Sequence, residues 1–506
     1  MKNKKLGFTL IELLAVIIVL AIIALIATPI IFNVIENAKI KSLENSCYGV
    51  IDAVRTKYAE GLLNLNKITN GNVNELTVSG EKPIDGTWTI DNSKDSEQRG
   101  IKIDNVRFSS MKDYACSNDL ETGKVSCKKT YKDNSSANTP ILFKNMVPIK
   151  YENNKWIIAD LGQKWYDYDA KEWANAVVLN SGVTKNVGDE VTEEEISLWY
   201  VWIPRYKYTI FNGNNGSAAA QLINVAFESG VSRTGTVTCT DNADGSETCS
   251  TITNGTSTYT HPAFKFGNTE LTGFWVGKFE VSGSTSTITV KPNVTSLRSQ
   301  TVSSFFTAIQ NVKTTYGINN ADSHIMKNME WGAVAYLKQS KYGLGTTDIA
   351  INDNSSFYTG GGTSDAYKTN VAQSTTGNIY GVYDMSGGAY EYVMGNMKNS
   401  SNAFYPNGSG FKTVPDSKYY DVYMYGVGTQ TNYHARGKLG DATKEILVHF
   451  NYNAGGWYKD HSYFVKDTYS WLSRGGGHSG TSSAGIFYFN GVNGGASNYY
   501  STRAVL

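Results

Sequence analysis

The chain begins with a run of apolar side chains that is long enough to cross a lipid bilayer. From Leu13 to Phe32 nearly every residue is Leu, Ile, Val or Ala, and only Thr28 and Pro29 interrupt the run. About twenty helical residues span about 30 Å, the thickness of the hydrocarbon core of a bilayer. Lysines precede the run, and basic flanks tend to stay on the cytoplasmic side. The pattern therefore predicts a membrane-inserted helix and export of the chain that follows residue 32.

The spacing of apolar residues predicts that this helix continues beyond the membrane. Apolar positions recur at the three- and four-residue intervals of one helix face, and the segment from Gly61 to Gly71 is a suitable place for the helix to end. We expect this face to pack on the following domain. Its positions are Val34, Ile35, Ala38, Leu43, Val50, Ile51 and Val54.

A single carboxylate, Glu12, lies where the apolar run begins. A carboxylate near hydrocarbon is costly and is retained where a partner compensates its charge. If the helices of neighbouring subunits pack side by side, the amino terminus of one subunit can neutralise Glu12 of the next and so fix their register. The alternative is a plain membrane anchor in which Glu12 lies at the level of the lipid head groups.

The segment "KKLG" followed by "FTLIELL" resembles the type IV prepilin family, which includes the pseudopilins of type II secretion and competence systems. In that family a prepilin peptidase cuts after the glycine, methylates the new amino terminus and leaves the apolar helix in place. The resemblance implies cleavage between Gly7 and Phe8, an assembly role for Glu12 and a helix kink at Pro29. It also implies three partners: other pilins or pseudopilins, the prepilin peptidase, and the inner or cytoplasmic membrane.

Composition and charge limit the classes of function that are expected for the remaining chain. There are 49 Gly, 33 Tyr and 10 Trp, a composition that suits short strands, turns and binding loops. Lys and Arg number 46 and Asp and Glu number 45, so the net charge of +1 offers no basic surface for nucleic acid. At 506 residues the chain is too long for one core, and several structural units are expected.

Four of the five cysteines form two close pairs, Cys116 with Cys127 and Cys239 with Cys249. Each pair brackets a polar, turn-rich segment, so two extended arms joined by a turn bring the sulfurs within bridging distance. We predict two disulfides formed outside the cytosol, with four reduced thiols as the alternative. Cys47 has no evident partner in the sequence, and a packed free thiol is expected there.

The predicted leader comprises residues 1–7, and the predicted helix comprises residues 8–65. The region that follows the helix is divided in two by a polar break near residue 138. Residues 66–138 alternate in short runs and predict a small β-rich pilin-type region. Residues 139–195 predict a β module or linker, in which aromatic side chains fill the core; carbohydrate stacking is the alternative role for them. These aromatic residues are Trp156, Trp165 and Trp173.

Several phrases in the C-terminal part occur together in a familiar order. The segments "YVWIPRYKYTI" and "GFWVGKFEVSG" predict two aromatic-rich strands, and "SHIMKNMEWGAVAYLKQSKYG" predicts a helix that packs on them. With "GVYDMSGGAYEYV", "SRGGG" and the terminal "TRAVL", they resemble the formylglycine-generating-enzyme and sulfatase-modifying-factor family, whose fold is a variant of the C-type lectin fold. The resemblance covers about residues 196–506. It implies an α+β protein with a transmembrane pilin helix, a small β-rich region and a C-type-lectin-like domain.

This chain lacks the residues that carry out the chemistry of that family. No cysteine follows Cys249, whereas the enzyme needs thiols near the end of the domain to hold copper and to attack a substrate cysteine. We therefore expect no enzymatic activity and no cofactor; an enzyme of this family that uses another site is the alternative. Arg474 and Arg503 match structural positions of the family, where a guanidinium satisfies loop carbonyls.

A second departure concerns calcium. Gly388 stands where the family has an asparagine, and Tyr390 and Tyr392 replace two tryptophans. Asp384 and Glu391 remain as calcium candidates, because carboxylates supply the oxygen ligands that calcium prefers. The alternative is that both carboxylates cap turns and satisfy buried amides.

The final stretch interleaves Gly, Asn, Ser and Tyr, which give adaptable hydrogen bonds and flat contact area at low entropy cost. C-type-lectin-fold proteins of the retroelement-diversified class carry variable ligand-binding residues at the corresponding place, and this tail is similar to theirs. A loop-rich surface without a ligand is the alternative. The candidate ligand-binding residues are His478, Ser479, Tyr488, Asn490, Asn493, Asn498, Tyr499 and Tyr500.

These predictions combine into a type IV pilin-like protein that passes the membrane once and presents an extracellular domain for binding a protein or a glycan. Because so large a domain is bulky for a filament shaft, we expect a tip or low-abundance position on a pilus or cell surface. The alternative is a pseudopilin that acts only in filament assembly, type II-like secretion or competence.

The mature protein is expected to begin at Phe8 with a methylated amino terminus, because the resemblance places the peptidase cut after Gly7. Mass spectrometry of the N-terminal peptide, taken from protein purified out of its native membrane, measures both features. A native chain that begins at Met1 would contradict the prepilin assignment.

Overall fold

The computed structural model describes residues 10–63, 68–90, 100–210, 220–235, 237–242, 247–249, 258–425, 437–446 and 455–506. The predicted processing residues Gly7 and Phe8 lie outside the described residues. Pro29 falls within a described helix, but its side chain also lies outside the described set, as do those of Ile22, Ala24, Ile26 and Ile30.

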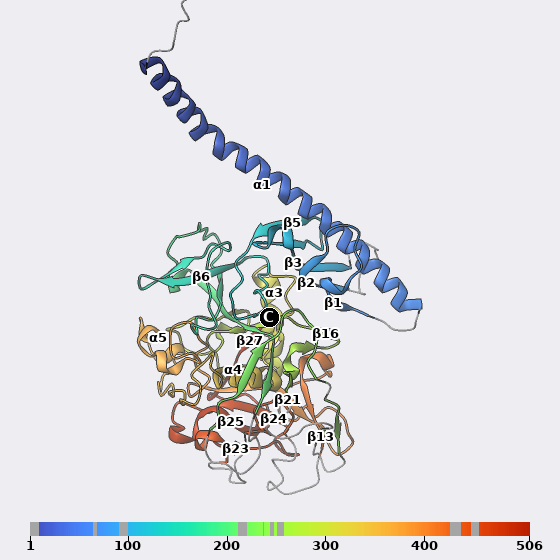
Figure 1. Cartoon of the computed structure of the whole chain (residues 1–506). Coiled ribbons are helices and arrows are strands. Elements are labelled where there is room, and N and C mark those ends of the chain that lie inside the picture. The colour runs from blue at the N-terminus through green and yellow to red at the C-terminus, as the bar shows by residue number, and fades with distance from the viewer. Residues whose placement is uncertain are drawn as a thin grey trace, which may run out of the picture. The chain divides into compact units, whose positions relative to one another are not determined.

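The chain folds into two compact units, and each is described by itself (Figure 1). Unit 1 comprises Met1–Ile68 and Val73–Lys128, and unit 2 comprises Thr69–Asn72 and Lys129–Leu506. A mixed helix and sheet architecture, with an N-terminal helix and a β-rich body, is therefore confirmed.

Unit 1 consists of one long helix and a small antiparallel sheet. The helix α1 runs without a break from Leu10 to Leu63, which is 54 residues. The sheet follows with strands paired in chain order. These strands are β2 (Pro83–Ile90), β3 (Ile101–Phe108), β4 (Tyr114–Asn118) and β5 (Val125–Lys129).

The two halves of α1 differ in how they are covered within unit 1. Large apolar side chains in the first half are exposed, for example Leu10 at 83 % and Val34 at 62 %. In the second half a single helix face is buried against apolar residues of β3 and β4. That face comprises Leu43, Cys47, Val50, Ile51 and Val54. In the part of the chain that the structure describes, no helix has the combined length and apolar character of a membrane span, so the predicted membrane-spanning segment is not confirmed.

Unit 2 contains most of the strands and the shorter helices. Its strands are β1 (Asn70–Asn72), β6 (Met146–Glu152), β7 (Lys155–Ile158), β8 (Asn175–Leu179), β9 (Ile196–Pro204), β10 (Tyr206–Thr209), β11 (Asn224–Phe227), β12 (Cys239–Asp241), β13 (Glu247–Cys249), β14 (Tyr259–Thr260), β15 (Lys265–Phe266), β16 (Thr269–Glu270), β17 (Gly273–Gly277), β18 (Ser282–Ser284), β19 (Thr287–Thr289), β20 (His324–Ile325), β21 (Tyr390–Met397), β22 (Asp421–Tyr423), β23 (Ser462–Tyr463), β24 (Trp471–Gly475), β25 (Gly485–Val492), β26 (Tyr500–Thr502) and β27 (Ala504–Val505). Its α-helices are α2 (Val302–Gln310), α3 (Val312–Thr315), α4 (Asn328–Lys338) and α5 (Ala366–Thr369).

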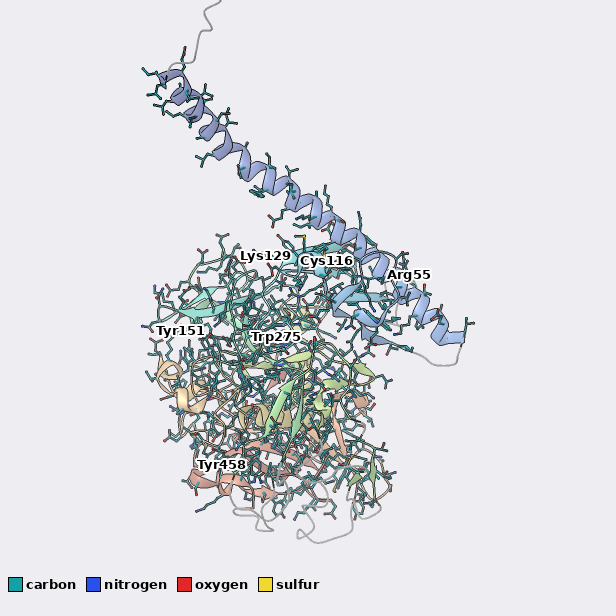
Figure 2. The ribbon with its side chains drawn as sticks, viewed as in Figure 1. Arg55, Cys116, Lys129, Tyr151, Trp275 and Tyr458 are labelled. Atoms are coloured by element: carbon teal, nitrogen blue, oxygen red, sulfur yellow. A yellow bond between two sulfur atoms is a disulfide. The ribbon has the colours of Figure 1, made fainter. Side chains whose placement is uncertain are left out.

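The larger sheet of unit 2 has the strand order β20-β27-β17-β9-β8-β6-β7. Its central strand β9 is buried at every position, which explains the unbroken apolar and aromatic run in the sequence. The two aromatic-rich strands predicted from the sequence, β9 and β17, pair directly and antiparallel. Figure 2 shows Trp275 of β17 inside unit 2, and this side chain is fully buried.

The segment expected as a separate β module, residues 139–195, contributes β6, β7 and β8 to this same sheet. In this structure the segment is thus continuous with the rest of unit 2. Its three tryptophans are at most 3 % exposed, so they pack in the core and offer no surface for carbohydrate stacking. They are Trp156, Trp165 and Trp173.

The smaller sheet of unit 2 has the order β22-β21-β24-β25-β23, and β26 also pairs with β21. In Figure 1, β6 lies toward one end of unit 2, β27 lies near its middle, and β24 and β25 lie toward the other end. The end of the chain joins the two sheets, because β26 belongs to the smaller sheet and β27, two residues later, belongs to the larger one. The predicted helix is α4, in which every residue is buried.

Candidate functional site

The register of the smaller sheet places polar and aromatic side chains on one of its faces. Tyr392 of β21 lies opposite Ser473 of β24, and Ser473 lies opposite Asn490 of β25. Tyr463 of β23 lies opposite Asn490 on the other side. Residues directly opposite one another in paired strands project from the same face. One face of the sheet therefore carries residues from four separate parts of the chain.

Aromatic rings make continuous contact along this face. Tyr392 and Tyr500 stack with their ring centroids 4.7 Å apart and an interplanar angle of 15°. Tyr500 then contacts Tyr390 at 5.2 Å, and Tyr390 contacts Tyr488 at 5.7 Å. These separations are those of favourable aromatic pairs.

The series of rings continues to the far edge of the sheet. Tyr488 stacks with His461 at 5.2 Å, and His461 stacks with Tyr463 at 6.3 Å. Lys466 lies 5.7 Å from the Tyr463 ring centroid and ends the series with a cation. We call this surface the tyrosine face, and it comprises Tyr390, Tyr392, His461, Tyr463, Ser473, Tyr488, Asn490 and Tyr500.

The tyrosine face is partly covered by neighbouring parts of unit 2. Tyr392 and Tyr488 are 1 % and 6 % exposed, whereas Tyr390, Tyr463 and Tyr500 are half-buried. Burial, together with the neighbouring Tyr390, raises the pKa of Tyr500 to about 12.

His461 and Asn490 add hydrogen-bonding groups to the rings. Burial lowers the pKa of His461 below its usual range, and a hydrogen bond with Asn490 opposes this shift only in part. The imidazole is therefore neutral at pH 7. Asn490 and Ser473 also hydrogen-bond with Tyr488.

The opposite face of the same sheet is buried and holds the sheet in place. The guanidinium of Arg474 lies 5.5 Å from the ring of Trp331 and 5.8 Å from that of Phe489. Arg474 also donates hydrogen bonds to the carbonyls of Asp441 and Ala442, at 3.3 and 3.2 Å. This cation lies among loop carbonyls inside unit 2, which is the structural position expected from the sequence.

The loop between β25 and β26 borders the tyrosine face. The Tyr392 hydroxyl donates to the Gly495 carbonyl at 2.5 Å, and the Tyr390 amide donates to the Tyr499 carbonyl at 2.9 Å. Tyr499 itself is 52 % exposed. These hydrogen bonds attach the loop to β21. The exposed Tyr499 side chain therefore projects from a backbone that is held in place.

A second cluster lies beside this loop. The Arg298 guanidinium covers the Phe357 ring at 3.8 Å and donates to the Asn498 carbonyl. His478 packs edge-on against the same Phe357 ring, with centroids 4.5 Å apart. Ser479 is exposed.

The structure brings together only some of the predicted ligand-binding residues. Tyr488, Asn490 and Tyr500 belong to the tyrosine face. Asn493, Asn498 and Tyr499 are exposed in the adjoining loop. His478 and Ser479 follow β24, and His478 packs on Phe357 rather than in the ring series.

Five of the eight residues of the tyrosine face are not among the predicted ligand-binding residues. The missed residues come from strands that precede the tail, and the alternation Tyr-Glu-Tyr in "AYEYV" was a signal, because period-two spacing places both rings on one face. The missed members are Tyr390, Tyr392, His461, Tyr463 and Ser473.

The two calcium candidates lie inside unit 2 and are fully buried. Glu391 accepts hydrogen bonds from Arg503 with both carboxylate oxygens, one of them from Nε at 3.0 Å. Asp384 accepts from the Gly360 amide at 2.8 Å and the Asn352 amide at 2.9 Å through Oδ1.

A third buried carboxylate, Glu280, completes this cluster. Its Oε1 accepts from the Ala389 amide at 2.9 Å, and Ser296 donates to its Oε2. Gly388 has a φ of +67°, and a Cβ there would lie 2.5 Å from Glu280 Oε1. Position 388 therefore requires glycine, because this backbone conformation and this close carboxylate leave no room for a side chain.

These residues do not fit a calcium ion as they are arranged. Calcium takes six to eight oxygen ligands. Here the oxygens of Glu391 and Glu280 are already engaged, and Asp384 Oδ2 is the one carboxylate oxygen of the three described groups without a hydrogen-bond partner. The Arg503 guanidinium supplies the positive charge that a metal would bring.

Both predicted cysteine pairs are confirmed as disulfides. Cys116 in β4 and Cys127 in β5 are bridged in unit 1, and Cys239 in β12 and Cys249 in β13 are bridged across a hairpin in unit 2. Cys47 is a buried free thiol.

Comparison with known proteins adds one finding at the N-terminus. A family model described as the prokaryotic N-terminal methylation motif matches residues 2–28. The chain matches no curated protein. The motif supports a type IV pilin-like protein that is anchored in a membrane or located on a pilus or the cell surface. In general it implies assembly with other pilins and processing by a prepilin peptidase.

The buried carboxylate cluster contributes more to the stability of unit 2 in mild acid than at neutral pH. Burial raises the pKa of Glu391 to about 7 and that of Glu280 well above its usual range, despite the nearby Arg503. The folded state therefore binds protons that the unfolded chain releases above about pH 4.5. The free energy of unfolding contributed by the cluster falls as pH rises from about 4.5 through 7.

The variant Glu280→Gln removes one of these charges without changing the shape of the side chain. We expect it to raise the free energy of unfolding at pH 7.5 by about 1 kcal/mol, and less at pH 5, because one unit of pKa shift corresponds to about 1.4 kcal/mol. Urea titrations at both pH values, with EDTA present, measure this. Glu194→Gln, at an exposed site, is the control. A Glu280→Gln protein that is less stable than the natural chain at pH 7.5 would overturn this account.

Proposed function

We propose that the protein is a minor type IV pilin or pseudopilin whose unit 2 is a C-type-lectin-like domain that recognises a glycan on another surface. The observation that carries this proposal is the tyrosine face, a series of contacting aromatic rings on one partly covered sheet face. The same surface is suitable for a protein ligand, and the binding experiment below distinguishes the two.

The chemistry of the tyrosine face favours a sugar. Half-buried rings offer flat apolar area that matches the C–H faces of a pyranose, and the rings lose little side-chain entropy on binding. The side-chain amide of the half-buried Asn490, between the rings, supplies a donor and an acceptor of the kind that hydroxyl groups need. The arrangement resembles a ligand site with an apolar floor and a few placed polar groups.

Two features support a lectin-like reading of unit 2. The sequence phrases of the resembled family occur in β9, β17, α4, β21, β24 and β27, and these elements surround one core. The last strands, β26 and β27, return to pair with strands of both sheets. Enzymatic activity of the formylglycine-generating type is not part of the proposal, because the sequence has no cysteine after Cys249.

The N-terminal part supports anchoring and assembly. Glu12 lies in the first turn of α1, and the large apolar side chains around it are exposed. We propose that residues 8–32 are held in the membrane before assembly and that Glu12 pairs with the amino terminus of a neighbouring pilin. A domain as large as unit 2 suits a tip or low-abundance position, with unit 2 outside the cell.

Loss of an aromatic ring from the tyrosine face is expected to weaken glycan binding. Tyr463→Ala and Tyr500→Ala should each reduce affinity at least about fivefold, because truncating a residue central to a binding surface commonly costs more than 1 kcal/mol. Glycan-array screening of the full mature chain in detergent identifies a ligand, and calorimetry then measures the affinities.

Matched variants separate stacking from general damage. Tyr463→Phe keeps the ring and should bind within about threefold of the natural chain. Tyr48→Ala removes an exposed tyrosine of α1 and should have no effect. If a protein binds but no glycan does, the proposal that the ligand is a glycan is wrong. If neither binds, the protein acts in filament assembly alone.

Loss of the Glu12 charge is expected to prevent incorporation into filaments. Glu12→Gln keeps the side-chain shape but leaves the amino terminus of the neighbouring subunit unpaired in an apolar setting, which is unfavourable. We expect a drop of at least about tenfold in the filament fraction with an unchanged amount in the membrane, measured by immunoblotting. Glu60→Gln, an exposed acid further along α1, is the control. Normal incorporation of Glu12→Gln would rule out charge pairing.

A further inference from the structure

Unit 1 contains a third sulfur beside its disulfide. The sulfur of Cys47 in α1 and those of Cys116 and Cys127 all lie within 4.8 Å of one another. Cys47 is fully buried, and its neighbours are apolar residues of the core of unit 1. Figure 2 labels Cys116 on the sheet beside α1. A free thiol is thus held next to a bond with which thiolates react.

We propose that Cys47 is a site of disulfide exchange that links α1 covalently to β4. The thiolate of Cys47 attacks the sulfur of Cys116, so the bond between Cys47 and Cys116 forms while the bond between Cys116 and Cys127 breaks. Cys127 leaves as a thiolate and takes up the proton that Cys47 released. One disulfide and one thiol are present before and after the step, so no external oxidant or reductant is needed.

The positions of the two disulfide cysteines favour Cys127 as the leaving thiol. Cys116 is fully buried in β4, which is paired with β3 and β5. Cys127 is 7 % exposed and belongs to β5, an edge strand among the described residues. A thiolate is less costly near water than in an apolar core, so the departing charge is better placed on Cys127.

The surroundings of Cys47 keep the exchange slow in the intact fold. Burial, and then the negative charge of Glu44 on the same helix, raise the pKa of the Cys47 thiol to about 12. The facing strands contribute the apolar Ile103 and Val106 together with the disulfide itself. A pKa near that value leaves only about one thiol in 10⁵ ionised at pH 7.

The exchange changes what the disulfide holds together. The bond between Cys116 and Cys127 closes a short segment, with a sequence separation of 11. A bond between Cys47 and Cys116 closes a much longer one, and longer closed loops restrict the unfolded chain more. It also ties α1 to the sheet of unit 1 by a covalent bond, so that pulling on the helix no longer separates the two without breaking that bond.

The sequence allows a direct test by peptide mapping. Trypsin places the three cysteines in separate peptides, residues 42–55, 113–124 and 125–128. The full chain is incubated without oxidant at pH 7.5 and at pH 9.5, then denatured in acid and its free thiols are alkylated. We expect the label to move from Cys47 to Cys127, and the linked peptide 42–55/113–124 to appear about a hundredfold faster at pH 9.5, as the thiolate fraction rises.

Two variants keep the test decisive. Cys47→Ser should retain the bond between Cys116 and Cys127 at both pH values, which excludes scrambling between molecules. Cys127→Ser, checked for native circular dichroism, should form the bond between Cys47 and Cys116 when treated with oxidised glutathione. A label that stays on Cys47 at pH 9.5 would overturn the proposal. So would a folded Cys127→Ser protein that yields only free thiols or glutathione adducts.

Discussion

The ion pair between Arg503 and Glu391 is the contact on which the arrangement of unit 2 depends. Arg503 lies between β26, in the smaller sheet, and β27, in the larger one, and it is fully buried. It binds Glu391 of β21 and donates to the carbonyls of Gly277, at 2.8 Å, and Tyr383, at 2.9 Å. One cation thus joins both sheets, and breaking such a buried pair typically costs about 3–5 kcal/mol.

The tyrosine face follows from this constraint. Because Glu391 must point inward to meet Arg503, its neighbours Tyr390 and Tyr392 must point outward, since successive strand residues alternate between faces. Arg474 holds the adjacent strand in the same way and leaves Ser473 on the outer face. The inner charges thereby set the orientation of the outer rings, and the tyrosine face is built on paired strands rather than on loops alone.

The N-terminal unit has a different physical basis. Its helix buries one face against a small sheet, while the apolar side chains of its first half are exposed within the unit. Such a surface is unfavourable in water, and the methylation motif matches this same end of the chain, at residues 2–28. The disulfide between Cys116 and Cys127 and the thiol of Cys47 lie where this helix meets its own sheet.

The sequence by itself determined the features that are local along the chain: the helix from its apolar spacing, the processing motif, both disulfides, and the strands β9 and β17. Such features depend on neighbours a few residues apart, so a linear pattern carries them. Only the tertiary structure decided which rings share the tyrosine face, why position 388 requires glycine, which groups hydrogen-bond with Asp384 and Glu391, and that Cys47 lies beside a disulfide. Each of these depends on strand register or on packing between segments far apart in the chain. Residue spacing within one strand shows which of its side chains share a face, as for Tyr390 and Tyr392, but it does not show which strands pair or in which register.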